Sequence, residues 1–172
     1  WFWMQHAPQV LPDQDNDPGT IDILVFDNGT FRDFVEKAPK KALYSRMVQY
    51  RIHQQTQTIE QIWSYGKERG FELYSSIKSN ANYHPKTGNY LGTFGEVQSQ
   101  NDANRYDGVI LEVTRQKEVV FEVRLTDTRT IYRSERIEMN ELIPEMTVGK
   151  QAGKYLKNDI PYSVYEYPLS SN

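Results

Sequence analysis

The stretch LYSRMVQYRIHQQTQTIEQIWSY, Leu43–Tyr65, carries the clearest structural signal in this chain. Its two arms, Leu43–Ile52 and Thr58–Tyr65, are rich in β-branched and aromatic residues, and the polar run HQQTQ separates them. Two arms of this kind joined by a short polar turn predict an antiparallel hairpin. Because a single hairpin is marginally stable in water, we expect further strands to pair with it.

The same pattern returns downstream. The arms Gly108–Val113 and Val119–Leu125 flank the turn TRQKE, and a constant offset superimposes Ile52 on Val113 with loops of equal length. A recurrence of this kind indicates an internal repeat.

Each hairpin is preceded by a shorter pair of strands. Upstream of the first hairpin, HAPQVLP and IDILVFDNG flank the polar insertion DQDNDPGT; upstream of the second, SNANYHP and YLGTFG flank the turn KTGN. Four strands in sequence order are typical of a β-propeller blade. An ordinary β-meander or sandwich is the alternative that spacing alone leaves open. Two blades cannot close a ring, since propellers have about 4 to 8 blades.

Composition narrows the class of protein. The 172 residues suffice for one domain core, and an aromatic content of 13% favours β structure. The net charge is −3, with no basic block that would neutralise a phosphate backbone, so we expect no nucleic-acid partner. No run approaches the roughly 20 apolar residues of a membrane span, so we expect a soluble chain with no membrane partner. Without cysteine, disulfides and thiolate nucleophiles are excluded.

The C-terminal part differs in character. Residues 139–172 contain three prolines and scattered tyrosines without a helical stripe, so we divide the chain into blades at 1–138 and an irregular tail at 139–172. The tail has possible short strands at 140–148 and 162–168, and we expect it to close or cover an edge. We expect one short helix, near Phe31–Lys37.

Three histidines are the first candidates for chemistry. His53 and His84 lie in predicted turns, where side chains are usually solvated. His6 lies at the start of an inner strand, behind an aromatic run. An imidazole can act as a nucleophile or general base near neutral pH, although residue types alone favour a hydrogen-bonded structural histidine at this position.

Other polar clusters carry weaker signals. Asp13, Asp15 and Asp17 alternate in DQDND, but the spacing of a calcium-binding EF-hand is absent and a solvated loop is expected. The stretch FDNGTFR is interpreted as a strand that ends in a tight Asn-Gly turn. Lys67, Glu68 and Arg69 are interpreted as surface charge or an ion pair. No zinc pattern is present, and we expect no metal and no cofactor.

The ordered set QHAPQVLP, LVFDNG, YSRMVQYRI, TIEQIWSYGKERG and SNANYHPKTGNYLGTFG resembles the C-terminal part of bacterial arylsulfate sulfotransferases. The resemblance runs from about Trp3 to Glu138 and is weaker in the tail. It implies a fragment of a six-bladed β-propeller, all-β, that comprises about two four-stranded blades. It also implies an exported, typically periplasmic protein that forms a homodimer at full length.

The resemblance further implies a reaction. The histidine of the family's Gln-His-(Thr/Ala) motif accepts a sulfuryl group from an aryl sulfate donor and passes it to a phenolic acceptor, and that histidine corresponds to His6 here. Two further histidines and an arginine of the family correspond to positions upstream of Trp1, so we expect the isolated fragment to be inactive. A family Thr-Ser pair at the start of the second inner strand appears here as Lys78-Ser79, which makes Lys78 and Ser79 candidate substrate-binding residues.

Two other functions remain open at this stage. The first is a propeller piece without enzymatic activity that binds a ligand or partner through its inner strands. The second is a glycoside-cleaving propeller, which would need two carboxylates facing one cavity, whereas most acids here lie in predicted loops.

Overall fold

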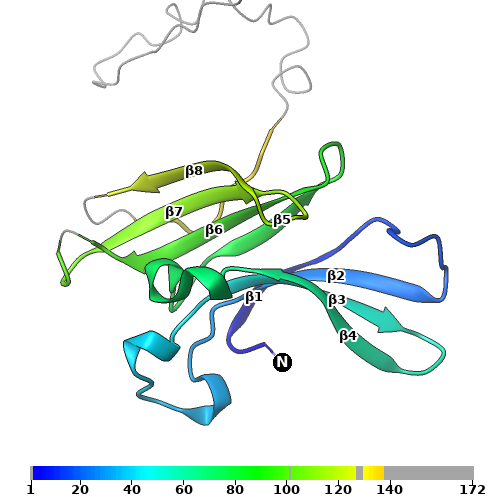
Figure 1. Ribbon diagram of the computed structural model, residues 1–172, viewed down its shortest axis with the longest axis horizontal. Coiled ribbons are helices and arrows are strands. Elements are labelled where there is room, and N and C mark those ends of the chain that lie inside the picture. The colour runs from blue at the N-terminus through cyan, green and yellow to red at the C-terminus, as the bar shows by residue number, and fades with distance from the viewer. Residues whose placement is uncertain (1, 101, 127–129, 138–172) are drawn as a thin grey trace, which may run out of the picture. The chain divides into compact units, whose positions relative to one another are not determined.

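The described residues form eight strands, in segments rich in β-branched and aromatic residues (Figure 1). The structure, a computed structural model, describes residues 2–100, 102–126 and 130–137. The first sheet contains β1 (Gln5–Val10), β2 (Thr20–Asp27), β3 (Arg46–His53) and β4 (Thr58–Tyr65). The second contains β5 (Asn80–His84), β6 (Asn89–Gln98), β7 (Tyr106–Val113) and β8 (Val119–Leu125).

Both sheets have the same topology. Their strand orders are β1-β2-β3-β4 and β5-β6-β7-β8, and every pairing is antiparallel between neighbours in sequence. The two predicted hairpins are β3-β4 and β7-β8, and the shorter upstream pairs are β1-β2 and β5-β6. This confirms the all-β prediction of two four-stranded blades, a β-propeller fragment.

The main hydrophobic core lies between the two sheets. Alternation along each strand directs one set of apolar side chains to this side. The Phe26 and Phe94 rings meet edge to face with their centroids 5.0 Å apart, and Trp63 stacks on Tyr90 at 3.8 Å. Gly92 permits this close approach, because a Cβ there would lie 2.9 Å from the sulfur of Met47. The sheets therefore pack through interlocking aromatic side chains.

Helical structure differs from the expectation of one helix near Phe31–Lys37. That region contains only the short 3₁₀ turn η1 (Arg32–Phe34), because Phe31, Asp33 and Phe34 have φ angles of 58°, 55° and 61° and interrupt any helix. Two more 3₁₀ turns occur, at η2 (Lys40–Ala42) and η3 (Lys67–Leu73). Among the described helices, none has the length and apolar character that crossing a bilayer requires.

After β8, the chain returns to the second sheet. The N–H of Ile131 donates to the Gly95 carbonyl at 2.9 Å, and the Asn82 amide donates to the Ser134 carbonyl at 2.8 Å. Residues up to Glu135 thus form one compact unit. The proposed strands at 140–148 and 162–168, and with them the tail from residue 139, lie outside the described residues.

Candidate functional site

Antiparallel pairing places the end of β2 beside the start of β1. His6 is opposite Phe26, and Gln5 is opposite Asp27. The turn after β2 begins with Asn28, which is fully buried and lies next to the partly buried His6. The FDNG segment, residues 26–29, therefore lies beside the candidate histidine.

Asn28 determines which nitrogen of His6 carries the proton. Its side-chain N–H₂ group donates to the carbonyl oxygens of Ser75, at 2.7 Å, and Lys78, at 3.2 Å. The amide therefore presents its oxygen to His6, and the distance from Oδ1 to His6 Nδ1 is 2.6 Å. Since an amide oxygen only accepts, Nδ1 must donate, which leaves the lone pair of the neutral imidazole on Nε2.

The Asp27 carboxylate is hydrogen-bonded both to the segment before β1 and to the turn after β2. One carboxylate oxygen accepts the N–H groups of Trp3, at 2.8 Å, and Gly29, at 3.1 Å. The other accepts Arg46 Nε at 2.8 Å and Arg32 Nη2 at 3.1 Å. Because Asp27 is fully buried, these four donors compensate for the loss of its hydration. The start of β1 and the turn after β2 are thus held by one carboxylate.

Two serines link this turn to the second blade. Ser45 donates its hydroxyl to the Asn28 carbonyl at 2.7 Å and accepts the Ser75 N–H at 2.9 Å. Both serines are fully buried. Together with the Asn28 amide, they fix the approach of the chain to β5.

Ser79 lies at this approach, next to the start of β5. Its hydroxyl accepts the Gly95 N–H at 3.0 Å and lies 3.0 Å from Ser75 Oγ and 3.3 Å from the Ile77 carbonyl. The residue is only 3% exposed. The hydroxyl is thus engaged by the surrounding turn, and sulfate binding by Ser79 stays a prediction.

Lys78 shares a partner with His6, because its carbonyl accepts from Asn28. Its ammonium group donates to Thr130 Oγ1 at 2.8 Å and lies 3.9 Å from a Glu96 carboxylate oxygen. The structure therefore brings the backbone of Lys78 close to the His6 support, while its charge is balanced by Glu96. A role in substrate binding stays a prediction for this residue too.

The other two histidines lie at the far ends of their strands. His53 pairs with Thr20, the first residue of β2, and its Nε2 lies 3.1 Å from Glu60. His84 ends β5. Since His6 is beside the last residues of β2, neither histidine joins its site.

The aspartates of DQDND accept backbone hydrogen bonds within their own loop. Asp13 accepts the N–H groups of Asp15 and Asn16, and Asp15 pairs with Arg51 at 2.6 Å. Desolvation would raise the pKa of Asp15, but hydrogen bonds from Asp17 and Thr20, together with the Arg51 charge, lower it overall. The described residues contain no group of three or more potential metal ligands.

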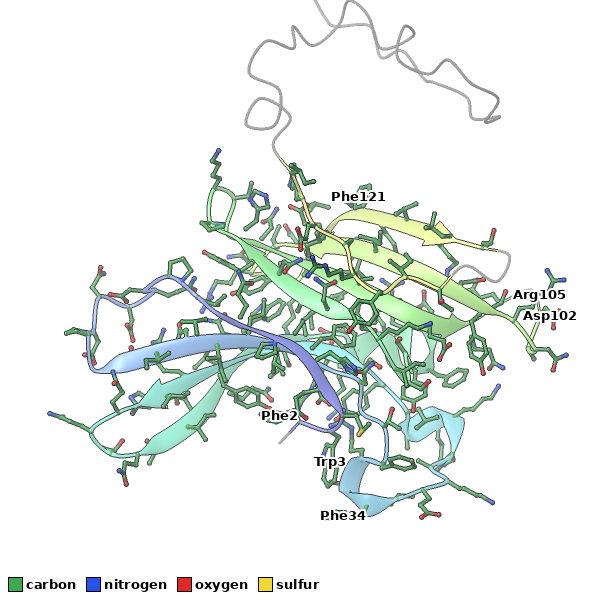
Figure 2. The ribbon with its side chains drawn as sticks, turned by 180° about the vertical axis from the view of Figure 1, so that it is seen from behind. Phe2, Trp3, Phe34, Asp102, Arg105 and Phe121 are labelled. Atoms are coloured by element: carbon green, nitrogen blue, oxygen red, sulfur yellow. The ribbon has the colours of Figure 1, made fainter. Side chains whose placement is uncertain are left out.

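Two aromatic residues, Phe2 and Trp3, precede His6 in the chain. Trp3 meets Phe34 edge to face with ring centroids 4.8 Å apart, and the two residues lie together in Figure 2. Phe2 meets Tyr50 at 5.6 Å on the first sheet. The segment Phe2–Met4 precedes β1 rather than extending it, so its aromatics form packing contacts outside the strand.

Comparison with known proteins now bears on this site. The family described as Arylsulfotransferase (ASST) matches residues 1–133, which include both blades, His6, Lys78 and Ser79. The chain belongs to this family.

Two curated relatives agree with the family match. An arylsulfate sulfotransferase from Escherichia coli O6:H1 is 33% identical over 102 residues, 59% of this chain and 17% of that protein. One from Lelliottia amnigena is 38% identical over 81 residues, 47% of this chain and 13% of that protein. The matched part is thus less than a fifth of either arylsulfotransferase.

The sequence alone did not indicate that Asp27 and Asn28 bond to the segment around His6, because FDNG was interpreted only as a turn. Two polar residues that directly follow the apolar run ILVF were the available signal. Buried polar groups need partners, so such a pair at the end of a buried strand indicates a hydrogen-bonded centre.

Proposed function

We propose that this chain supplies the nucleophile of an arylsulfate sulfotransferase, and that His6 Nε2 carries the sulfuryl group between an aryl sulfate and a phenol. Family membership supports the reaction class. The observation that carries the residue assignment is the Asn28 amide, which keeps the proton on Nδ1 and the lone pair on Nε2.

The reaction consists of two displacements at sulfur. In the first, the Nε2 lone pair forms the N–S bond while the bond from sulfur to the aryl oxygen breaks, and the phenolate leaves with its electron pair. In the second, an acceptor phenol loses its proton to water as its oxygen attacks sulfur, and the N–S electron pair returns to Nε2. The sequence is ping-pong, with no net oxidation or reduction.

Asn28 favours the first displacement because its amide oxygen stabilises the positive charge that develops on the imidazole. The imidazole becomes positively charged as the N–S bond forms, and the Nδ1–H bond to the Asn28 oxygen strengthens with that charge. This dipole is already oriented by its bonds to Ser75 and Lys78, so it need not reorganise during reaction. Asn28 therefore acts as a positioning residue for His6.

The whole protein's properties belong to the same proposal. Negative charge on the sulfuryl oxygens and on the leaving oxygen requires cations and donors, which the family resemblance assigns to two histidines and an arginine upstream of Trp1. Lys78 is a candidate for an additional cation. A periplasmic location and a homodimer at full length are also proposed from the resemblance.

The test is sulfuryl transfer from p-nitrophenyl sulfate to phenol by the full-length parent. His6→Ala should lower kcat/KM at least about a thousandfold, the scale expected when a nucleophile is removed. Intact-mass analysis of the parent with donor alone should show one added sulfuryl group, and analysis of its peptides should locate that group on His6. His53→Ala is the matched control and should retain activity.

Unimpaired transfer by His6→Ala would overturn the assignment. A parent that binds aryl sulfates without transferring them would instead favour the alternative, a β-propeller binding module without enzymatic activity.

A further inference from the structure

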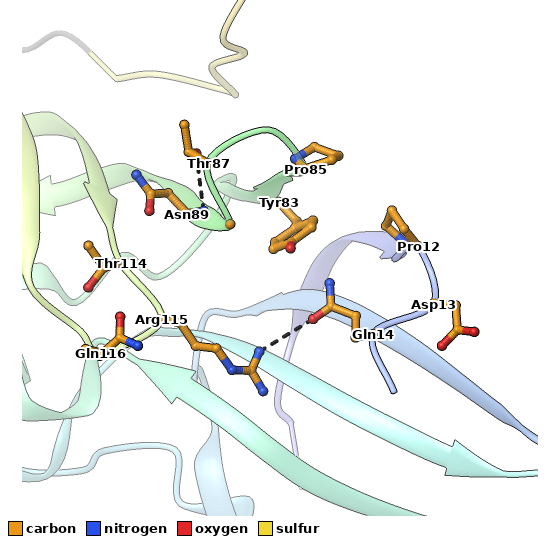
Figure 3. Close-up of a pocket in the computed structure, with 11 residues that line it drawn as sticks. Pro12, Asp13, Gln14, Tyr83, Pro85, Thr87, Asn89, Thr114, Arg115 and Gln116 are labelled. Carbon is orange, nitrogen blue, oxygen red and sulfur yellow. Dashed lines mark hydrogen bonds between the residues drawn. The ribbon is translucent and has the colours of Figure 1, made fainter. Parts of the chain in front are cut away.

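A cavity, shown in Figure 3, lies beyond the C-terminal end of β1, whereas His6 is near the start of that strand. It has a volume of about 670 Å³, within the usual range for small-molecule sites. Its walls come from the segment after β1 and from the β5-β6 and β7-β8 turns. Since β1 has six residues, the cavity is roughly 20 Å from His6 at about 3.3 Å per residue.

Arg115 is the cation of this cavity. Its Nη1 donates to Tyr90 Oη at 2.9 Å and contacts Gln14 Oε1 at 3.5 Å, which fixes the guanidinium between the two blades. The Trp63 indole N–H donates to the Arg115 carbonyl at 2.9 Å and holds the backbone as well. The arginine is therefore positioned by contacts from both blades.

The remaining donors of the Arg115 guanidinium have no carboxylate partner among the described residues. No carboxylate in the described part of the chain forms an ion pair with it, and only Nη1 is hydrogen-bonded to another described residue. A guanidinium with free Nε and Nη2 hydrogens presents the edge that binds carboxylates and sulfonates through two parallel hydrogen bonds.

An aromatic wall accompanies this cation. The partly buried Tyr83 ring lies beside the cavity with Pro12 and Pro85 near it, and it packs on Tyr90 with centroids 5.3 Å apart. Gly88 leaves the β5-β6 turn without a side chain that could fill the space, and its φ of 73° disfavours any other residue. A flat ring therefore has a surface on which to stack.

Asp13 limits the charge of the ligand. Its carboxylate lines the same cavity but is occupied by two N–H groups of its own loop. A second negative group on the ligand would meet this carboxylate, whereas one anionic group at Arg115 would not. The cavity thus combines one available cation, one ring surface and one repelling charge.

We propose that this cavity is a binding site for a small aromatic monoanion, with its carboxylate, sulfonate or sulfate group on Arg115 and its ring against Tyr83. The site is distinct from that of His6 and does not depend on sulfuryl transfer. The site selects ligands by their single negative charge and by their flat ring.

The test is an NMR titration of the full chain with naphthalene-2-sulfonate, which carries one charge and no transferable sulfuryl ester. The indole N–H resonance of Trp63 is the reporter, because its partner is the Arg115 carbonyl. We expect a saturable shift of this resonance. The neutral analogue naphthalene-2-sulfonamide should bind at least about tenfold more weakly, since it lacks the charge-assisted bonds.

Variants separate this site from other causes. Arg115→Gln and Tyr83→Ala should each weaken sulfonate binding about tenfold, and Arg115→Lys should have an intermediate effect. Arg105→Gln is the matched control, because Arg105 precedes β7 whereas Arg115 follows it, and it should bind like the unchanged chain. His6→Ala should also bind normally.

An unchanged affinity in Arg115→Gln, equal binding of the sulfonamide, or a sulfonate shift that is absent from Trp63 would each overturn the proposal.

Discussion

The first and second blades share one topology and differ in how the start of the inner strand is held. In the first, Asn28 follows β2 and fixes His6 through its amide. In the second, Gly95 lies near the corresponding end of β6 and donates its N–H to the Ser79 hydroxyl. The Lys78 ammonium group lies beside the Glu96 carboxylate. One blade thus presents the imidazole of His6, and the other presents an ammonium group beside a carboxylate. The two blades thus share a backbone topology but differ in the polar groups held at the starts of β1 and β5.

Two buried carboxylates test this difference through stability. Asp27→Asn should lower the free energy of unfolding by about 3 kcal/mol, because Arg32 and Arg46 lose their negative partner in a buried setting. Asp107→Asn should cost only about 1 kcal/mol, since Asp107 has one ion pair at 3.3 Å and a buried Oδ1 without a partner among the described residues. Urea unfolding of both variants measures the two values. Equal losses would contradict the central role assigned to Asp27.

Asn28 tests the chemical half of the comparison. Asn28→Ala should lower kcat of the parent about a hundredfold, with the KM for aryl sulfate little changed, because the Nδ1 proton loses its acceptor. Asn28→Asp retains an acceptor and should recover part of the rate. The ¹⁵N shifts of the His6 ring should show mixed tautomers in Asn28→Ala and the unchanged tautomer in Glu96→Gln, a change beside Lys78 in the second blade. A single Nδ1–H tautomer in Asn28→Ala would refute the positioning role.

Tyr90 connects the two blades and gives a third test of the comparison. Its hydroxyl donates to Gln49 Oε1 at 2.6 Å and accepts from Arg115, so Tyr90→Phe should cost about 1 to 2 kcal/mol. Burial raises the pKa of Tyr90 above its usual value of 10.0.

The sign of the pH effect follows from that shift. Above about pH 10, the unfolded phenol loses its proton before the folded one, so the native state binds more protons and stability falls as pH rises. Tyr90→Phe should reduce this alkaline loss in urea unfolding at a series of pH values. Tyr106→Phe, at a residue that is 45% exposed, should not. An identical pH slope in Tyr90→Phe would show that other groups cause the loss.

Local patterns predicted the strands well, because β-branched and aromatic arms joined by polar turns are features of a few neighbouring residues. The hairpin arms at Thr58–Tyr65 and Val119–Leu125 agree with β4 and β8 residue for residue. The helix near Phe31–Lys37 was wrong in extent, since three left-handed residues reflect local contacts that composition does not encode.

The site was harder to predict, because its bonds join distant parts of the chain. His6 could be singled out from its strand position and the family motif. The bond from His6 to Asn28 spans 22 residues, and the bond from Asn28 to Ser75 spans 47. Neither the sharing of Asn28 by His6 and Lys78 nor the cavity around Arg115 can be derived from spacing within one blade.

The return of the chain after β8 has a consequence for where this unit can be cut. Ser134 supplies a carbonyl to Asn80 and Asn82 and meets the hydroxyl of Thr93. A chain shortened at Leu125 would leave the buried Asn80 of β5 and Thr93 of β6, which pair with each other, without these partners. Any excised or transplanted version of the second blade therefore needs the chain through Ser134, even though its last strand ends nine residues earlier.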